Sequence, residues 1–189
     1  FWPFYEEVER LNVGLAFHGG IRASQRMHGR FGSFIAVHTL AFPLECMVAL
    51  TGYIYSGAPE QFPKLRIAAL EASCGWVPFL MDRMDEEFEI RGKREAPLLK
   101  RKPSEYLTGG QFYWAFELEE TTLPYVAERI GSDKLLYSSD YPHWDTSWPH
   151  SVRAVTKRGD LTDSHKKRFL GENAQRFYGF KTSFLRVAA

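Results

Sequence analysis

The chain has 189 residues, which fits one domain with a sizeable core but falls short of the roughly 250 residues of a complete (β/α)₈ barrel. Hydrophobic residues make up 44% of the sequence and charged residues 25%, values typical of a folded globular protein and not of a disordered one. The formal net charge of +1 lacks the basic excess that nucleic acids or anionic membranes select, so we expect neither as a partner.

Hydropathy and cysteine usage indicate where the protein works. No run approaches the roughly 18 consecutive apolar residues of a membrane span, so we expect no transmembrane helix. Cys46 and Cys74 are the only cysteines and form no disulfide framework, which predicts a reducing, cytoplasmic compartment. The chain opens on Phe1-Trp2-Pro3 without an initiator methionine, so we expect it to be an internal part of a longer sequence.

Short apolar runs alternate with helical patterns along the chain. The patterns expected to be helices cover residues 4–11, 40–56, 76–90, 121–130, 150–157 and 162–178, and residues 20–33 are expected to form a loop. The runs expected to be strands cover residues 13–17, 65–70, 112–116 and 134–138. Strand and helix alternate through the chain, which predicts an α/β fold with parallel strands in a single domain, residues 1–189.

Polar side chains follow the predicted strands. His18 ends the first strand, Glu71 the second, and Asp140 the fourth, with His143 shortly after it, whereas Glu117 is less clearly placed after the third. Functional groups of parallel α/β folds gather at the carboxyl ends of the strands, so we expect these side chains to share one site. Imidazole and carboxylate groups bind metals and move protons, and the site is expected to do one or both.

Structural explanations of the same residues stay open. His18 beside two glycines is also compatible with a capped loop, and Asp140 with a turn residue that binds the backbone. Cys74 stands at a predicted helix start, but no local signature of a cysteine enzyme surrounds it. The sequence also contains no G-x-S-x-G nucleophile elbow and no phosphate-binding loop.

Two segments resemble a known family. Residues 61–79, QFPKLRIAALEASCGWVPF, resemble the strand-six region of the amidohydrolase-related family, and residues 136–145, LYSSDYPHWD, resemble its strand-eight motif. Weaker similarity is found in residues 103–106 and 173–179. The family contains metal-dependent hydrolases and decarboxylases such as aminocarboxymuconate-semialdehyde decarboxylase, and the resemblance runs over nearly the whole chain.

The resemblance implies a (β/α)₈ barrel of which this chain covers strands five to eight, the C-terminal half. It also implies one divalent metal, usually Zn²⁺ with Mn²⁺ or Fe²⁺ as alternatives. By position, His18 matches the family's strand-five metal ligand and Asp140 its strand-eight ligand, whereas the strand-one His-x-His pair has no counterpart. Glu71 stands where many members carry a histidine that activates water, so Glu71 is expected to act as the general base.

The activity implied is that of a metal-dependent hydrolase acting on a small carboxylated or aromatic substrate. Asp140, Glu71 and His143 are the expected catalytic residues. The residues expected to line the substrate pocket are His38, Trp144 and Trp148, whereas packing is the favoured role of Trp76.

Other activities stay open. The first alternative is a metal-dependent, non-oxidative decarboxylase of the same family. The second, from another class, is a non-catalytic barrel fragment or binding scaffold. Half a barrel is expected to be inactive alone, and because its open strand edges invite association, a homodimer of half-barrels is a further alternative.

Overall fold

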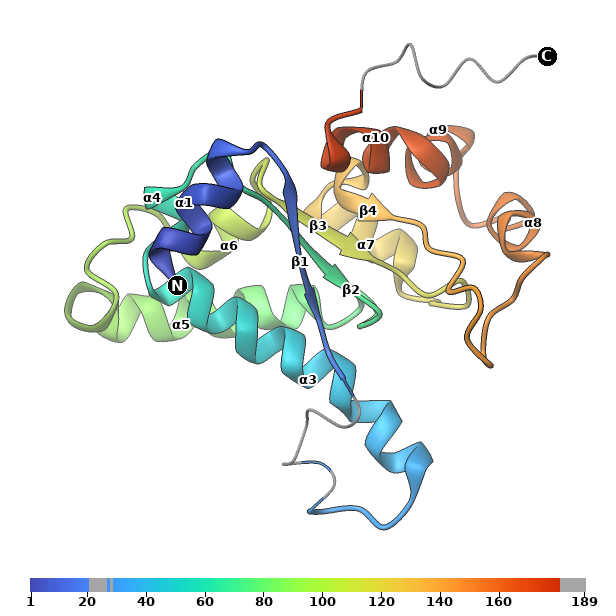
Figure 1. Ribbon diagram of the computed structural model, residues 1–189, viewed down its shortest axis with the longest axis horizontal. Helices are drawn as coiled ribbons and strands as arrows, with labels where there is room; N and C mark the ends of the chain where they lie inside the picture. Colours follow the sequence, from blue (N-terminus) through green and yellow to red (C-terminus); the bar gives the residue numbers. More distant parts are fainter. Residues whose placement is uncertain (21–26, 28, 181–189) are drawn as a thin grey trace.

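The computed structural model describes residues 1–20, 27 and 29–180, and its centre is a parallel sheet (Figure 1). The strands lie in chain order, β1-β2-β3-β4, and their bounds are Gly14–His18, Arg66–Leu70, Phe112–Ala115 and Leu135–Leu136. Every neighbouring pair is parallel, with His18 opposite Leu70 and Ala115 opposite Leu136. The predicted α/β architecture is confirmed, and the strands end along one edge of the sheet.

Helices connect consecutive strands. Before β1 lies α1 (Trp2–Arg10), and between β1 and β2 lie α3 (Phe34–Tyr55) and α4 (Ala58–Gln61). Between β2 and β3 lie α5 (Val77–Glu95) and α6 (Pro103–Leu107), followed after β3 by α7 (Leu123–Ile130) and the 3₁₀ turn η1 (Ser132–Lys134). After β4 come α8 (Ser151–Thr156), α9 (Asp163–Lys167), the π-helical turn η2 (Arg168–Glu172) and α10 (Asn173–Tyr178).

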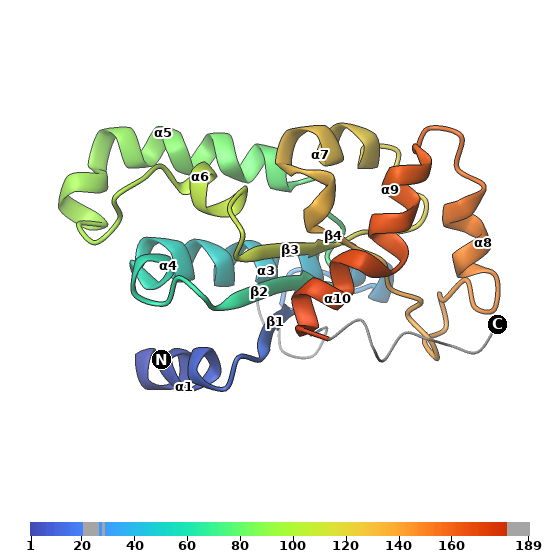
Figure 2. The same ribbon diagram turned by 90° about the horizontal axis from the view of Figure 1, so that it is seen from above.

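The two faces of the sheet are covered differently. The helices α3, α5 and α7 form a layer on one face, where Ile67 of β2 and Trp114 of β3 enter the main core (Figure 2). On the other face Ala68 and Tyr113 pack with Phe177 of α10. Side chains alternate between the two faces of a sheet along each strand. A strand that is covered on both faces therefore needs apolar residues on both. This explains the short unbroken apolar runs by which the strands were predicted.

Helix α3 begins earlier than the predicted residue 40, at Phe34, after Ser33 in an extended conformation. Proline lacks a backbone N–H and is therefore expected in a first turn, but Pro43 stands inside this helix. The resulting helix of 22 residues is long and apolar enough, by length and composition alone, to cross a membrane. It packs against β1 and α5, and Cys46, Leu50 and Ile54 are among its residues in the main core.

Other differences concern short elements. The predicted fourth strand, residues 134–138, ends at Leu136 because the Tyr137 N–H donates to the Phe169 carbonyl instead of to a neighbouring strand. The helix predicted over residues 162–178 is continuous from Asp163 to Tyr178, with the π-helical turn η2 between α9 and α10. Much of the predicted loop 20–33 lies outside the described residues.

Candidate active site and metal centre

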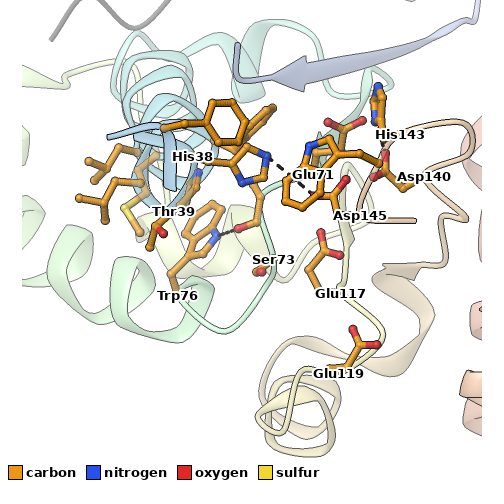
Figure 3. A pocket seen from close by; sticks show the side chains of 18 residues that line it. His38, Thr39, Glu71, Ser73, Trp76, Glu117, Glu119, Asp140, His143 and Asp145 are labelled. Carbon is orange, nitrogen blue, oxygen red and sulfur yellow. Dashed lines mark hydrogen bonds and ion pairs between the residues drawn. The ribbon is translucent and has the colours of Figure 1, made fainter. Parts of the chain in front are cut away.

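A cavity of about 910 Å³ opens at the carboxyl ends of the strands (Figure 3). One wall comes from α3 and is largely apolar, with Phe34, Phe42 and Met47 among its residues. The loops after β2, β3 and β4 form the opposite wall. The carboxylates of that wall are Glu71, Glu117, Glu119, Asp140 and Asp145. The cavity therefore combines an acidic side with an apolar side.

Glu71 directly follows β2 and adopts a left-handed backbone conformation with φ of 50°. The parallel register sets His18 opposite Leu70, so the side chains of His18 and Glu71 meet at the sheet edge. The Nε2 atom of His18 lies 2.8 Å from Oε2 of Glu71, and both side chains are partly exposed. The two residues form an imidazole–carboxyl pair next to the cavity.

Asp140 lies in the segment after β4, with φ of 56°, and forms a second such pair with His143. The Asp140 Oδ1 and His143 Nδ1 atoms lie 2.5 Å apart, and the His143 N–H donates to the Asp140 carbonyl. The hydrogen bond that the His143 ring donates to Asp140, followed by the charge of Asp140, raises the pKa of His143. This tight turn brings both side chains to the cavity, as the sequence predicted for one site.

Three of these side chains suit a metal ion. Glu71, Asp140 and His143 each offer one ligand atom, and these atoms lie within 4.8 Å of one another. Two carboxylates and one imidazole are a donor set for Mn²⁺, Fe²⁺ or Zn²⁺, and three protein ligands leave a position for substrate or water. His18 is outside this group and reaches it through Glu71. The expectation that His18 and Asp140 are both ligands stays a prediction.

Glu117 is the member of the site that the sequence placed least clearly. It follows β3, and its backbone N–H donates to Oε2 of Glu120 at 2.9 Å. The carboxyl group faces the water of the cavity, but the protein atoms packed around it, and next the charges of Glu120 and Asp140, raise its pKa to about 7. The strand-end rule that selected the other residues also points to Glu117, because it is the second residue after the end of β3.

His38 and Trp144 line the cavity, at the positions the sequence predicted. The His38 ring stacks on Phe34 at a centroid distance of 5.3 Å and lies 5.9 Å from the Trp144 ring. Its Nε2 atom is 3.9 Å from Oδ2 of Asp145, so α3 and the loop after β4 meet at this point. These rings form an aromatic corner of the cavity.

Of the further tryptophans, Trp148 differs from expectation and Trp76 partly agrees with it. Trp148 is outside the described lining of the cavity, and its ring packs on Tyr141 at 5.4 Å. Thr146 accounts for this position, because its hydroxyl bonds the Ser139 carbonyl and accepts the Trp148 N–H, which folds the loop back. Trp76 packs on Trp114, as predicted, but it also lines the cavity.

A family model described as amidohydrolase matches residues 1–180. The chain belongs to the amidohydrolase family. Among solved structures it is similar to an amidohydrolase from Mycobacterium avium subsp. paratuberculosis, with 21% identity, a TM-score of 0.77, and coverage of 94% of this chain and 45% of that one.

Two further solved structures are similar to the chain at a comparable identity and over a comparable part of their length. The 5-carboxyvanillate decarboxylase from Sphingomonas paucimobilis has 23% identity and a TM-score of 0.75 over 95% of this chain and 53% of that one. A dihydroxybenzoic acid decarboxylase from Polaromonas was solved with manganese and the inhibitor 2-nitroresorcinol. It has 23% identity and a TM-score of 0.75, with coverage of 98% of this chain and 56% of that one. The chain thus spans about half the length of these structures, which confirms the predicted partial (β/α)₈ barrel.

Proposed function

We propose that this chain supplies half of the active site of a metal-dependent, non-oxidative decarboxylase acting on a small aromatic carboxylate. One observation carries the proposal: the Glu71–Asp140–His143 cluster and the aromatic corner of His38 and Trp144 share one cavity. The similar structures from Sphingomonas and Polaromonas, both decarboxylases of aromatic acids, support this reaction alongside the hydrolysis that the sequence alone favoured.

Glu71, Asp140 and His143 would hold the metal, for which the manganese of the Polaromonas structure supports Mn²⁺. A divalent ion supplies positive charge that binds the substrate carboxylate and stabilises negative charge as the carbon–carbon bond breaks. The cavity needs such charge, because its described lining contains carboxylates and neither lysine nor arginine. His18 would hold the Glu71 carboxyl group in place through their contact of 2.8 Å.

The protein must also deliver a proton. When CO₂ leaves, the electron pair of the broken bond remains on the ring carbon, which then takes up one proton. Glu117 is suited to donate it, because its carboxyl group faces the same cavity as Glu71, Asp140 and His143 and burial raises its pKa. Solvent in the open cavity then returns a proton to Glu117. His38 and Trp144 offer the faces and edges against which an aromatic ring packs.

Hydrolysis is the second candidate, and the Asp140–His143 pair favours it. A carboxylate hydrogen-bonded to imidazole is suited to accept a proton from an attacking water, with Glu71 as the neighbouring base. Both reactions use the same residues. They differ in product, since one releases CO₂ and the other cleaves an ester, lactone or amide.

The test uses the complete protein that carries this chain, loaded with Mn²⁺. We expect CO₂ release from hydroxybenzoates, and a loss of about 10²- to 10⁴-fold in kcat in Asp140→Asn with an unchanged circular dichroism spectrum. Asp163→Asn makes the same chemical change on the exposed first turn of α9 and should keep full activity. Ester or lactone cleavage without CO₂ release assigns the second candidate. Full activity after removal of the metal contradicts both.

A further inference from the structure

Glu120 joins the loops that follow β2 and β3 through one carboxylate. Its Oε1 atom accepts the backbone N–H groups of Cys74 at 2.9 Å and Gly75 at 2.7 Å. Its Oε2 atom accepts the Glu117 N–H at 2.9 Å and the Cys74 thiol at 3.5 Å. An ionised carboxylate has about four acceptor positions, so these donors use its whole capacity.

Arg158 holds the same loop from its other side. Its guanidinium group donates to the Leu118 carbonyl at 3.0 Å and to the Glu120 carbonyl at 2.8 Å. The same group pairs with Asp160 at 2.6 Å, which fixes its orientation. Arg158 follows α8, in the part of the chain beyond β4. Glu120 and Arg158 together therefore tie the loops after β2 and β3 to each other and to the segment that follows α8.

The loops after β2 and β3 carry Glu71 and Glu117, two residues of the proposed reaction. Glu71 and Ser73 precede Cys74 and both adopt left-handed conformations, with φ of 50° and 54°. Residues other than glycine keep such conformations only where surrounding contacts hold them. Glu117 is itself one of the donors to Glu120. The positions of Glu71 and Glu117 relative to each other thus depend on Glu120.

We propose that Glu120, braced by Arg158, is a positioning residue that fixes the spacing between Glu71 and Glu117 across the cavity. Glu120 is not among the described residues that line the cavity, so it acts through the two loops and not on the substrate. The inference rests on the proposed function in one respect, because that function assigns Glu71 and Glu117 to the reaction.

A substitution of the same size shows whether the carboxylate of Glu120 itself is required. In Glu120→Gln, one acceptor oxygen becomes an NH₂ group that faces backbone N–H donors. The glutamine can satisfy one loop and must release the other. Glu120→Asp keeps the charge on a shorter side chain and should recover part of the function. Glu128→Gln makes the same change on the exposed surface of α7 and serves as the control.

Amide hydrogen exchange tests the contact itself and requires no substrate. We expect exchange about tenfold faster at Cys74 and Gly75, or at Glu117, in Glu120→Gln, whereas amides inside β2 and β3 stay protected. The Glu128→Gln control should match the unaltered protein. Unchanged exchange at all three amides would overturn the proposal. If the glutamine variant does not fold, Glu120→Asp and Arg158→Lys provide the same measurements.

Kinetics of the complete, Mn²⁺-loaded protein test the positioning role. We expect kcat to fall about 10- to 100-fold in Glu120→Gln, with KM nearly unchanged and partial recovery in Glu120→Asp. Faster exchange with an unchanged kcat would overturn the proposal, because the loops would then be free without consequence.

A failure of the proposed function gives a different result. In that case the unaltered protein catalyses neither reaction, and Mn²⁺ titration replaces the kinetic readout. We then expect weaker Mn²⁺ binding in Glu120→Gln, since Glu71 is held through the loop that Glu120 fixes. Unchanged Mn²⁺ affinity together with faster exchange would overturn the positioning role independently of any activity.

Discussion

Glu71, directly after β2, and Asp140, in the loop after β4, both have a backbone in the left-handed region. Asparagine and aspartate adopt this conformation more readily than glutamate, and each such residue costs roughly 1–3 kcal/mol unless its surroundings hold it. Here the two turns direct the carboxyl groups of different strands toward one point, where ligand atoms lie within 4.8 Å of one another. The strained backbone at these two positions therefore brings the two carboxyl groups close together.

The two roles open to His18 predict different metal affinities. If His18 only orients Glu71, His18→Ala should weaken Mn²⁺ binding by about 10- to 100-fold, as is usual for a residue that holds a ligand in place. Asp140→Asn, which changes a ligand directly, should lose more. Isothermal titration of the complete protein measures both. Equal losses in the two variants would make His18 a ligand, as the family resemblance implies.

The raised pKa of Glu117 predicts that the stability of the folded protein depends on pH. Its pKa is about 7 in the folded protein against an ordinary value of 4.5, so folding disfavours its ionised form. The resulting penalty is absent below the unfolded pKa, grows as the pH rises between the two values, and is complete above the folded value. Glu117→Gln cannot ionise. Its Tm should therefore rise relative to the unaltered protein as the pH increases from about 4 to about 8.

Thermal unfolding of the metal-free protein measures this effect. Chelator is required throughout, because a bound cation would alter the charges around Glu117. Glu128→Gln, exposed on α7, should show a Tm difference that does not change over the same range. A constant difference for Glu117→Gln as well would contradict the raised pKa.

Residues of the site could be selected from sequence because the strand-end rule needs only the positions of strands. His18, Glu71 and Asp140 were found in this way. The rule could not rank them as ligands, since ligand distances depend on the register and on loop turns. The contacts of Glu120 could not be predicted from the sequence either, because its partner Cys74 lies in a different loop.

At the level of elements, the strands were predictable and the short helices were not. Apolar runs marked all four strands to within a few residues. In β2 and β3 these runs follow from burial on both faces of the sheet. Helices α4 and α6 span four and five residues, too few to show a helical period. The π-helical turn η2 also has no sequence signal of its own, so residues 162–178 read as one helix.

The attachment of α10 to β4 depends on Asn173, which is fully buried. Its Nδ2 group donates to the Ser132 carbonyl at 2.9 Å and to the Leu135 carbonyl at 2.6 Å. Asn173→Ala leaves both carbonyls buried without these donors and should lower the free energy of unfolding by roughly 2–4 kcal/mol. Urea unfolding measures the change. Gln175→Ala on the same helix should stay within about 0.5 kcal/mol, and an equally small effect of Asn173→Ala would contradict the prediction.

At the level of the whole molecule, the described strands form an arc with two edges. A closed barrel has no edge strands, but here β1 and β4 each have one neighbour among the described residues. Beside β1, an apolar groove between α1 and α3 is lined in part by Trp2, Phe17 and Val48. The solved structures to which the chain is similar are about twice as long. An arc of this kind exposes surface that a complete barrel covers.

We therefore expect the 189-residue chain, produced alone, to associate with a second copy through this groove and the β1 edge. Val48 on α3 is 52% exposed and lies in the groove, whereas Val152 on α8 is 49% exposed and lies outside it. Val48→Lys places a charge in the contact and should weaken association by about tenfold or more, because a buried unpaired charge is costly. Val152→Lys should leave association unchanged. Sedimentation velocity over a range of protein concentrations measures both variants, and a monomer at every concentration, or equal effects of the two lysines, would show that this groove does not drive association.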